Sequence, residues 1–309
     1  MRFDFPLSVF PPIRGRFFWA ATRHSPLATR HFPSTIMPMN LHTIHATAVE
    51  TARAAGALLR DGYGQKPDIQ HKSAAGDWVT QFDLAAEALI SDRLTRAFPD
   101  HAIVAEESGT NHRAGPWRWY VDPLDGTNNF AHGLPTFCVS LALWEETQPR
   151  VGVVYDPLRD ECFSAIAGQG AWLTTGDARR PLAVSQTAEL VYSLVATGFP
   201  YDKHTSAVDN IAQTAVFLKR IQGLRRSGAA ALDLAYVAAG RLDGYWEQKL
   251  NSWDAAAGVL LVQEAGGQVT LLDGAPFALT PKLSLVASNG RIHAAMLAAL
   301  AAAAPGAAA

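Results

Sequence analysis

Residues 119–130 decide the fold of this chain, and they read Trp119-Tyr120-Val121-Asp122-Pro123-Leu124-Asp125-Gly126-Thr127-Asn128-Asn129-Phe130. An apolar strand pattern stops here at two aspartates three residues apart, and a Gly-Thr turn follows. Pro123 fixes its own φ and pushes Asp122 toward an extended conformation, so both carboxylates can point into one cleft. Such oxygen ligands suit magnesium and similar hard cations, which bind one or two carboxylates with water and substrate phosphate.

The turn after the aspartates suits a phosphate group. Gly126 permits close approach of the backbone, and free N–H groups at Gly126 and Thr127 can bind phosphate. The Thr127 hydroxyl could orient a water nucleophile, or it could simply cap a helix. Asp-Pro and Asp-Gly are also ordinary turn dipeptides. The apolar strand before the turn and the Asn-Asn-Phe after it make the whole run more specific than either dipeptide.

Two further acidic segments fit the same chemistry. Glu106 and Glu107 follow a short apolar strand, residues 102–105, and adjacent side chains on a strand point to opposite faces. We therefore expect Glu106 to face the cleft as a metal ligand and Glu107 to make a structural hydrogen bond or to support the water network. Asp254 stands at the start of an expected helix, where it is either a helix cap or a ligand from the other half of the chain.

Asp83 and Lys72 each allow two interpretations. Asp83 has the capping-box spacing from Thr80, and it could instead polarise the attacking water. Lys72 lies in a stretch expected to be a polar loop, residues 65–78. It could sample the phosphate or a third metal, although a solvated loop lysine is the simpler interpretation. Two metal ions about 4 Å apart can clamp the attacking and leaving oxygens of an in-line displacement, and Asp122 suits the bridging position.

Composition indicates a globular chain. The 309 residues are 49% hydrophobic and 17% charged, and the net charge of −2 gives no general attraction to nucleic acid or membrane. The two cysteines, Cys138 and Cys162, lack metal-ligand spacing and do not make a disulfide framework, so a reducing compartment, the cytoplasm, is expected. No apolar run approaches the roughly 20 residues that span a bilayer. Cys138 lies in an apolar strand pattern and is expected in the core.

The pattern divides the chain into three parts. Residues 1–38 are rich in arginine and interrupted by prolines, which predicts a disordered tail or a stretch outside the native protein, with a transit-like presequence as the alternative. Residues 39–180 are predicted to be an α+β half, and residues 181–304 an α/β half in which short strands alternate with helices. Because the acidic segments come from both halves, we expect the site at their junction.

Hydrophobic periodicity places the individual elements. In the first half, the second helix is expected at residues 80–98 with Leu84, Ala88 and Leu94 inward. The other expected helices cover residues 41–60, 208–221, 229–239, 253–265 and 291–302. The expected strands cover residues 102–105, 119–121, 136–144, 151–155, 162–165, 194–197, 242–246, 268–271 and 283–287.

Several motifs together resemble the inositol monophosphatase family. Residues 105–108 (Ala-Glu-Glu-Ser), the run 122–130 and residues 253–258 (Trp-Asp-Ala-Ala-Ala-Gly) match its signature motifs. Residues 197–201 and 228–247 also look like this family, especially its bacterial members. The resemblance covers roughly residues 41–302, and the motifs are highly specific in combination.

The resemblance implies a layered αβαβα sandwich, the sugar-phosphatase fold of inositol monophosphatase and fructose-1,6-bisphosphatase, and a homodimer. It implies two or three magnesium ions per site and inhibition by lithium. The implied metal ligands are the carboxylates of Glu106, Asp122, Asp125 and Asp254 and the carbonyl group of Leu124. Phosphate would rest on the Gly126 and Thr127 amides. Glu247, Ala230 and Asp254 would contact the rest of the substrate.

The expected activity is that of a phosphoric monoester hydrolase. Magnesium-activated water, with Glu106, Thr127, Asp83 and Asp125 as catalytic residues, would hydrolyse myo-inositol monophosphate without a covalent phospho-enzyme. Histidinol phosphate, 3′-phosphoadenosine 5′-phosphate and fructose 1,6-bisphosphate are alternatives, since one glutamate facing a polyol is not a specific code. A non-catalytic regulatory protein that binds protein or RNA is the alternative of another class. Retention of every ligand and the lack of a basic stripe weigh against it.

Overall fold

The computed structural model of this protein describes residues 40–72, 76–111 and 113–303. The expectations for residues 1–38 lie outside this part of the chain. The helices are α1 (Leu41–Gly62), α2 (Gln81–Ala97), α3 (Thr127–Ala131), α4 (Ile211–Leu218), α5 (Ala230–Ala238), α6 (Ser252–Glu264) and α7 (His293–Ala302), with a 3-10 turn η1 at Leu190–Tyr192.

The strands form three sheets. A small sheet pairs β1 (Ile69–His71) with β2 (Trp78–Thr80). The eight-stranded sheet contains β3 (Ala102–Ala105), β4 (Gly109–Asn111), β5 (Trp117–Asp125), β6 (Cys138–Glu145), β7 (Gln148–Asp156), β8 (Glu161–Ile166), β9 (Ala171–Thr175) and β10 (Ala178–Pro181). The five-stranded sheet contains β11 (Leu194–Thr197), β12 (Gly223–Arg225), β13 (Gly244–Asn251), β14 (Gln268–Leu271) and β15 (Lys282–Ser288).

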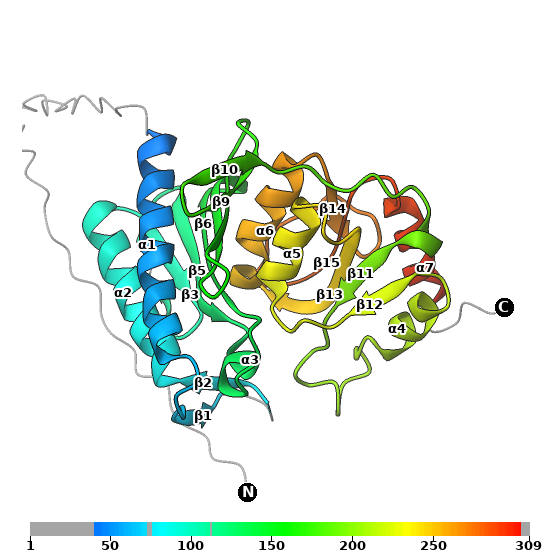
Figure 1. Ribbon diagram of the computed structural model, residues 1–309, viewed down its shortest axis with the longest axis horizontal. Helices are drawn as coiled ribbons and strands as arrows, with labels where there is room; N and C mark the ends of the chain where they lie inside the picture. The colour runs from blue at the N-terminus through cyan, green and yellow to red at the C-terminus, as the bar shows by residue number, and fades with distance from the viewer. Residues whose placement is uncertain (1–39, 73–75, 112, 304–309) are drawn as a thin grey trace, which may run out of the picture. The chain divides into compact units, whose positions relative to one another are not determined.

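These elements stack in five layers, which Figure 1 shows from left to right. Helices α1 and α2 cover the outer face of the eight-stranded sheet, and α5 and α6 lie between the two large sheets. Helices α4 and α7 cover the outer face of the five-stranded sheet. The predicted αβαβα sandwich of the sugar-phosphatase fold is therefore confirmed.

Strand β5 brings the two aspartates of the decisive stretch to one edge of the eight-stranded sheet. The sequence pattern predicted that this strand ends before Asp122, but the strand continues to Asp125. Its pairing with β6 shifts register between Asp122 and Asp125, because Pro123 between them has no N–H group to donate. Strand β3 runs parallel to β5, and Ala105 pairs with Val121. Glu106, the next residue, therefore comes beside Asp122.

Helix α6 is the central packing element, and its small residues explain how it fits. Residues 255–262 are all buried, as expected of a helix that lies between two sheets. A Cβ atom on Gly258 would stand 2.4 Å from the Leu234 Cβ atom of α5, so only glycine allows the two helices to approach this closely. Because α6 touches both large sheets, it fixes Asp254, near its first turn, relative to the β5 aspartates.

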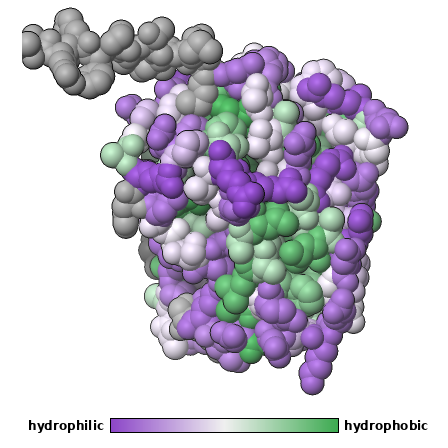
Figure 2. Space-filling model, turned by 90° about the vertical axis from the view of Figure 1, so that its left-hand side faces the viewer, coloured by the Kyte–Doolittle hydropathy of each residue, from purple (hydrophilic) through white to green (hydrophobic). Residues whose placement is uncertain are grey.

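The inward face predicted for α2 is confirmed at Leu94 but wrong at Leu84 and Ala88. Leu84 is 47% exposed and Ala88 is also exposed, whereas Asp83 and Glu87 are buried beside Leu94. The helix is turned so that two carboxylates face the interior, because the backbone and hydroxyl groups near the pocket need acceptors there. Figure 2 looks onto this side of the molecule, where hydrophobic residues gather in one area of a largely hydrophilic surface.

Other differences from the predicted elements concern short segments. The stretch 65–78 is not a plain loop, because Ile69–His71 pairs with Trp78–Thr80 in antiparallel register. The helix expected at residues 208–221 is confined to Ile211–Leu218. Strands β4, β10 and β12 were not anticipated. Each has three or four residues at a sheet edge, too few to show an alternating pattern.

Candidate active site

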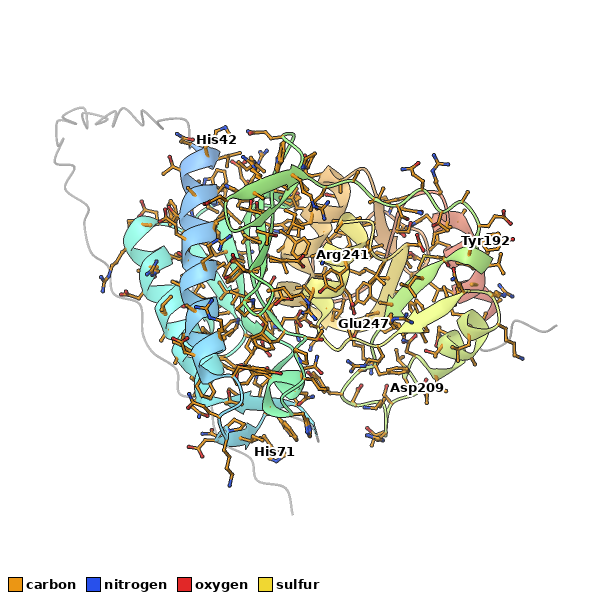
Figure 3. All side chains as sticks on the ribbon, in the orientation of Figure 1. His42, His71, Tyr192, Asp209, Arg241 and Glu247 are labelled. Atoms are coloured by element: carbon orange, nitrogen blue, oxygen red, sulfur yellow. The ribbon has the colours of Figure 1, made fainter. Side chains whose placement is uncertain are left out.

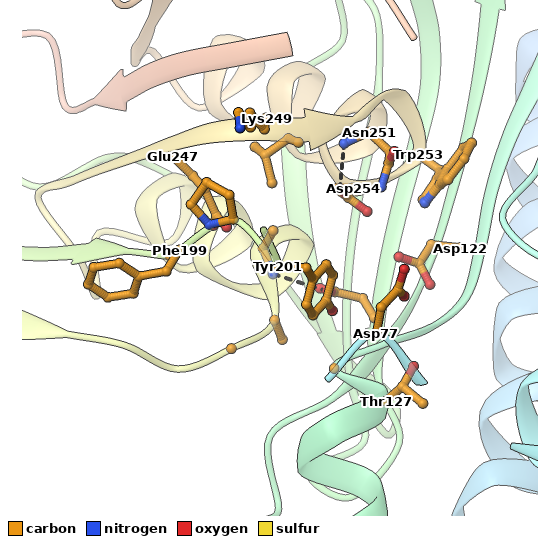
Figure 4. Close-up of a pocket in the computed structure, with 18 of the residues that line it drawn as sticks. Asp77, Asp122, Thr127, Phe199, Tyr201, Glu247, Lys249, Asn251, Trp253 and Asp254 are labelled. Carbon is orange, nitrogen blue, oxygen red and sulfur yellow. Dashed lines mark hydrogen bonds between the residues drawn. The ribbon is translucent and has the colours of Figure 1, made fainter. Parts of the chain in front are cut away.

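A cavity of about 710 Å³ lies where residues of both halves of the chain meet. From the first half it is lined by Glu106, Asp122, Leu124, Asp125, Gly126 and Thr127, and from the second half by Ala230, Glu247 and Asp254. Figure 4 shows Asp122, Thr127, Glu247 and Asp254 around this space. The fold thus brings together every residue predicted for the site except Asp83, which does not line the cavity.

Three aspartates form the acidic centre of the cavity, and their ionised forms are costly without a counter-charge. Burial raises the pKa of Asp122 well above its usual range, and repulsion by Glu106, Asp125 and Asp254 raises it further. The pKa of Asp254 is raised by the same causes, burial first and then the charges of Glu106 and Asp125. Burial raises the pKa of Asp125 to about 7, even though N–H donors partly offset it. A positive charge bound among these groups would relieve the repulsion.

Asp125 joins the two halves of the site. Its Oδ1 accepts a hydrogen bond from the Ala230 amide at 3.1 Å, and its Oδ2 accepts one from the Ala231 amide at 2.8 Å. These amides open α5, so the first turn of that helix holds a carboxylate of the other half. Cys138 is buried in the core, as predicted, and its Sγ also reaches Asp125 Oδ2 at 3.4 Å.

Asp254 combines the two interpretations that the sequence left open. Its Oδ2 accepts from the Asn251 amide at 2.7 Å, and the Asn251 side chain caps the first turn of α6 in return. The same residue lines the cavity and faces Asp122 from the opposite side. Asp254 is therefore both a helix-capping residue and part of the acidic centre.

Gly126 shapes the turn that follows Asp125. Its φ of 96° lies in the left-handed region, and a Cβ atom there would stand 2.9 Å from the Thr136 carbonyl oxygen. Gly126 is the N-cap of α3, so Thr127 is the first helical residue and not the cap. The Thr127 hydroxyl is thereby left to interact with other groups.

Asp83 supports Thr127 from outside the cavity. Thr127 Oγ1 lies 2.8 Å from Asp83 Oδ1 and 3.0 Å from the Leu124 carbonyl oxygen. Asp83 Oδ2 accepts from the Thr80 amide at 2.8 Å, and with the Thr80 side chain accepting from the helix backbone this is the predicted capping box. The same oxygen also accepts from the Thr80 hydroxyl at 2.5 Å. Burial raises the pKa of Asp83, although these donors oppose the shift. Asp83 thus caps α2 and orients Thr127 at the same time.

Glu87 is a supporting residue that sequence reasoning missed. Its two carboxylate oxygens accept from the Glu107 amide at 2.7 Å and the Ser108 amide at 2.8 Å. These contacts fix the turn directly after Glu106. The signal in the sequence was the spacing of Asp83 and Glu87, which are four residues apart and lie on one face of a helix.

Lys72 is not the solvated loop lysine that the sequence favoured. Its Nζ lies 2.8 Å from Glu106 Oε1 and 2.5 Å from Glu107 Oε1, and its side chain is 21% exposed. Burial alone would lower the pKa of Lys72, but the charge and hydrogen bonds of the two glutamates outweigh it and raise the pKa. Glu107 is thus engaged in a structural contact, as predicted, while Glu106 lines the cavity.

The opposite wall of the cavity carries Glu247, which Figure 3 shows in the middle of the molecule. The Tyr245 hydroxyl donates to Glu247 Oε2, and a Cβ atom on Gly198 would stand within 2.2 Å of the Glu247 carboxyl atoms. Burial raises the pKa of Glu247, and the Tyr245 hydroxyl and Arg226 oppose the shift. This carboxylate is held in one orientation with its other oxygen left for a ligand.

The donor set fits a hard divalent cation. Carboxylate oxygens from three separate chain segments and the Leu124 carbonyl surround one space, and magnesium prefers oxygen ligands of this kind. Across residues 40–72, 76–111 and 113–303, no three His, Cys, Asp or Glu side chains stand in the spacing of a finished metal centre.

The fold and this cavity define the layered αβαβα class of sugar phosphatases. The sequence profile of the inositol monophosphatase family matches residues 40–304. An inositol-1-monophosphatase of Synechocystis is 47% identical over 266 residues, which cover 86% of this chain and 91% of that protein. The Nus factor SuhB of Escherichia coli is 43% identical over 262 residues, covering 84% and 96%.

Solved structures of the inositol monophosphatase family resemble this chain as well. The inositol monophosphatase of Anabaena superposes with a TM-score of 0.76 at 44% identity and covers 86% of this chain and 98% of that chain. The chain belongs to the inositol monophosphatase family and is a phosphoric monoester hydrolase. Members of this family act on small phosphate esters and are generally metal-dependent. No helix in the described part of the chain is long and apolar enough to cross a membrane.

Proposed function

We propose that this chain hydrolyses myo-inositol monophosphate to inositol and phosphate with two or three magnesium ions. The observation that carries the proposal is that four acidic residues, the Gly126-Thr127 turn and Glu247 line one cavity. Glu106, Asp122, Asp125, Asp254 and the Leu124 carbonyl would hold the ions. When bound, magnesium supplies charge neutralisation and a water of lowered pKa.

The protein's own groups would then position the reactants. The Gly126 and Thr127 amides would hold the phosphate oxygens. The Thr127 hydroxyl donates a hydrogen bond to Asp83 Oδ1 or to the Leu124 carbonyl oxygen. The lone pairs of its own oxygen would then be free to accept a hydrogen bond from the attacking water and so orient it. A water near Asp254 would protonate the leaving alkoxide. Glu247 would accept hydrogen bonds from the hydroxyls of the polyol.

Other substrates remain alternatives for the same machinery. Histidinol phosphate, 3′-phosphoadenosine 5′-phosphate and fructose 1,6-bisphosphate all present a phosphate monoester on an alcohol. A regulatory binding role is a second candidate, because several relatives bear the name Nus factor SuhB. We further propose a homodimer in the cytoplasm, inhibited by lithium, with residues 39–180 and 181–304 as its two halves.

Phosphate release from the four esters, with magnesium and with EDTA, tests the proposal. We expect magnesium-dependent release that is fastest for myo-inositol 1-phosphate and falls when lithium is added. Faster release from another ester would replace the substrate and keep the chemistry. Release from none of them by folded, magnesium-bound protein would favour the regulatory role. Light scattering after size-exclusion chromatography would give the oligomeric state.

A further inference from the structure

Tyr201 is an aromatic side chain that stands uncovered inside the acidic cavity. It lines the cavity together with Glu247 and Asp254, and 50% of its surface is exposed. In Figure 4 its ring lies between Glu247 on one wall and Asp122 on the other. Across residues 40–72, 76–111 and 113–303 its hydroxyl group has no hydrogen-bond partner. The ring and the hydroxyl are therefore left for a ligand, and the hydrolysis described above gives them no role.

The tyrosine is close to the acidic centre as well as to the substrate side. Burial raises the pKa of the Tyr201 hydroxyl, and the charges of Glu106 and Asp254 raise it further. The hydroxyl therefore stays protonated and can donate a hydrogen bond to a bound alcohol. The raised pKa and the open surface agree, because the cavity walls enclose this side chain without covering it.

The loop that carries Tyr201 is fixed at its base. Residues 198–209 connect β11 to α4 without a helix or strand of their own. Asn210 is fully buried, and its Nδ2 atom donates to the Gly198 carbonyl oxygen and to Thr197 Oγ1, both at 2.7 Å. The Trp246 Nε1 atom donates to Asn210 Oδ1 at 2.7 Å. The two ends of the loop are thus joined to each other and to β13.

The far side of this loop is tied to the same strand. Lys249 Nζ lies 2.7 Å from Asp202 Oδ2 and 2.7 Å from Ser206 Oγ. Lys249 has a φ of 60°, which is uncommon for a residue other than glycine, and the register of β13 with β15 shifts just after Glu247. Strand β13 therefore positions the Glu247 carboxylate and the loop of Tyr201 relative to each other.

We propose that Tyr201 is a specificity residue that makes the cavity prefer phosphate esters of cyclic polyols over esters of open-chain alcohols. This inference rests on the proposed function and deepens it, because it names the class of alcohol that the cavity accepts. A cyclic polyol presents a face of C–H groups that can pack against an aromatic ring, while the hydroxyls at its rim reach Glu247. An open-chain alcohol has no such face, and it loses more rotational freedom when it binds.

The test compares hydrolysis of myo-inositol 1-phosphate and of glycerol 2-phosphate, an open-chain ester, by the full chain with magnesium. The wild type should favour the inositol ester. We expect Tyr201→Ala to lower kcat/KM for the inositol ester about tenfold, mainly through KM, and kcat/KM for the glycerol ester less than about threefold. Tyr201→Phe keeps the ring and should retain most of the preference. Inhibition by inorganic phosphate should stay the same, because phosphate lacks the alcohol that packs against the ring.

Tyr192→Ala is the matched control. Tyr192 lies in η1, is 64% exposed and does not line the cavity, so the variant removes a similar ring away from the substrate (Figure 3). Equal losses on both esters for Tyr201→Ala, or an equal loss of preference for Tyr192→Ala, would overturn the inference. Weaker inhibition by phosphate in Tyr201→Ala would assign the tyrosine to phosphate binding and overturn it too. A Tyr201→Phe variant as impaired as Tyr201→Ala would contradict the packing role of the ring.

Failure of this inference is distinct from failure of the proposed function. A wild type that hydrolyses the inositol ester while Tyr201→Ala keeps its full preference contradicts the role of Tyr201 alone. A wild type that hydrolyses neither ester, or that prefers the glycerol ester, contradicts both. Thermal unfolding of each variant confirms that it is folded before its kinetics are compared.

Discussion

The two walls of the cavity are held in different ways. The wall proposed to bind metal, called the metal wall, is formed by Asp122, Asp125 and Asp254 and is positioned mainly by backbone donors such as the Leu124, Ala231 and Asn251 amides. The wall proposed to bind substrate, called the substrate wall, is Glu247, positioned by one side-chain hydroxyl, that of Tyr245, and by the close approach of Gly198. Backbone amides survive any substitution except proline, whereas a hydroxyl can be removed by one change. The chemistry should therefore be robust, and the substrate preference adjustable.

Asp122→Asn should break the metal wall most severely. We expect kcat for phosphate release to fall on the order of 10³-fold, because one negative ligand at the centre of charge stabilisation is lost. Tm in EDTA should stay the same or rise, since the amide removes a buried charge that Glu106 and Asp254 repel. Steady-state kinetics and calorimetry measure the two effects. A variant that keeps normal kcat would exclude Asp122 from the reaction.

Thr127→Val tests the link between α2 and the metal wall. The substitution keeps the branched shape and removes the hydroxyl that lies 2.8 Å from Asp83. We expect kcat to fall about 10²-fold with little change in KM, because the hydroxyl acts on the attacking water and not on ground-state binding. Thr127→Ser, which restores the hydroxyl, should recover most of the loss. A rise in KM with unchanged kcat would instead indicate that Thr127 binds the phosphate.

Glu247→Gln tests whether the substrate wall recognises the polyol part of the substrate. It keeps the shape and removes the charge, so kcat/KM for myo-inositol 1-phosphate should fall about tenfold through weaker hydrogen bonds to the polyol. Hydrolysis of an aryl phosphate, which lacks those hydroxyls, should change less than about threefold by the same reasoning. Steady-state kinetics with the two esters give both changes in kcat/KM. Equal losses on both would assign Glu247 to the chemistry instead of to recognition.

The smallest expected effect concerns stability and lies away from both walls. His293 is buried, its ring nitrogens lie 2.9 Å from Thr270 Oγ1 and Ser288 Oγ, and burial lowers its pKa below 6.5. The unfolded chain then binds the proton more readily, so the free energy of unfolding falls as pH drops below about 6.5, by at most about 1.4 kcal/mol per pH unit. Denaturation at pH 7 and pH 5 measures this change. His293→Gln should lose that part of the pH dependence, whereas the exposed His42→Gln should retain it.

Several elements could be predicted because their signals are local. The strands at residues 102–105, 194–197 and 268–271 have the predicted bounds, and the capping box of Thr80 and Asp83 is present. The residues chosen for the site, Asp83 excepted, line one cavity. Thr127, Ala230 and Asp254 stand in the first turns of helices, whereas Asp122 and Glu247 lie within strands. Their roles toward metal and substrate stay predictions that the variants above test.

Other features depend on partners far away in the sequence. The α2 face was predicted wrongly because hydrophobic spacing favoured Leu84, whereas the fold buries Asp83 and Glu87 to satisfy distant donors. Lys72 was placed in solvent because nothing near it in the sequence indicates that Glu106 and Glu107 are within reach. A long-range hydrogen bond or ion pair leaves no periodic trace in the chain.

The sequence by itself determined the acidic residues and the turn that could cradle phosphate, because strand patterns, proline and glycine act over a few residues. It indicated the layered fold through its resemblance to a known family. Only the tertiary structure decided how these groups are supported: α5 amides on Asp125, Asp83 behind Thr127, Tyr245 on Glu247, and Lys72 against Glu106. The reason is physical. The pKa and the orientation of a buried charged group depend on the donors and charges around it. Those surrounding groups can come from any part of the chain, so they are known only once the tertiary structure is known.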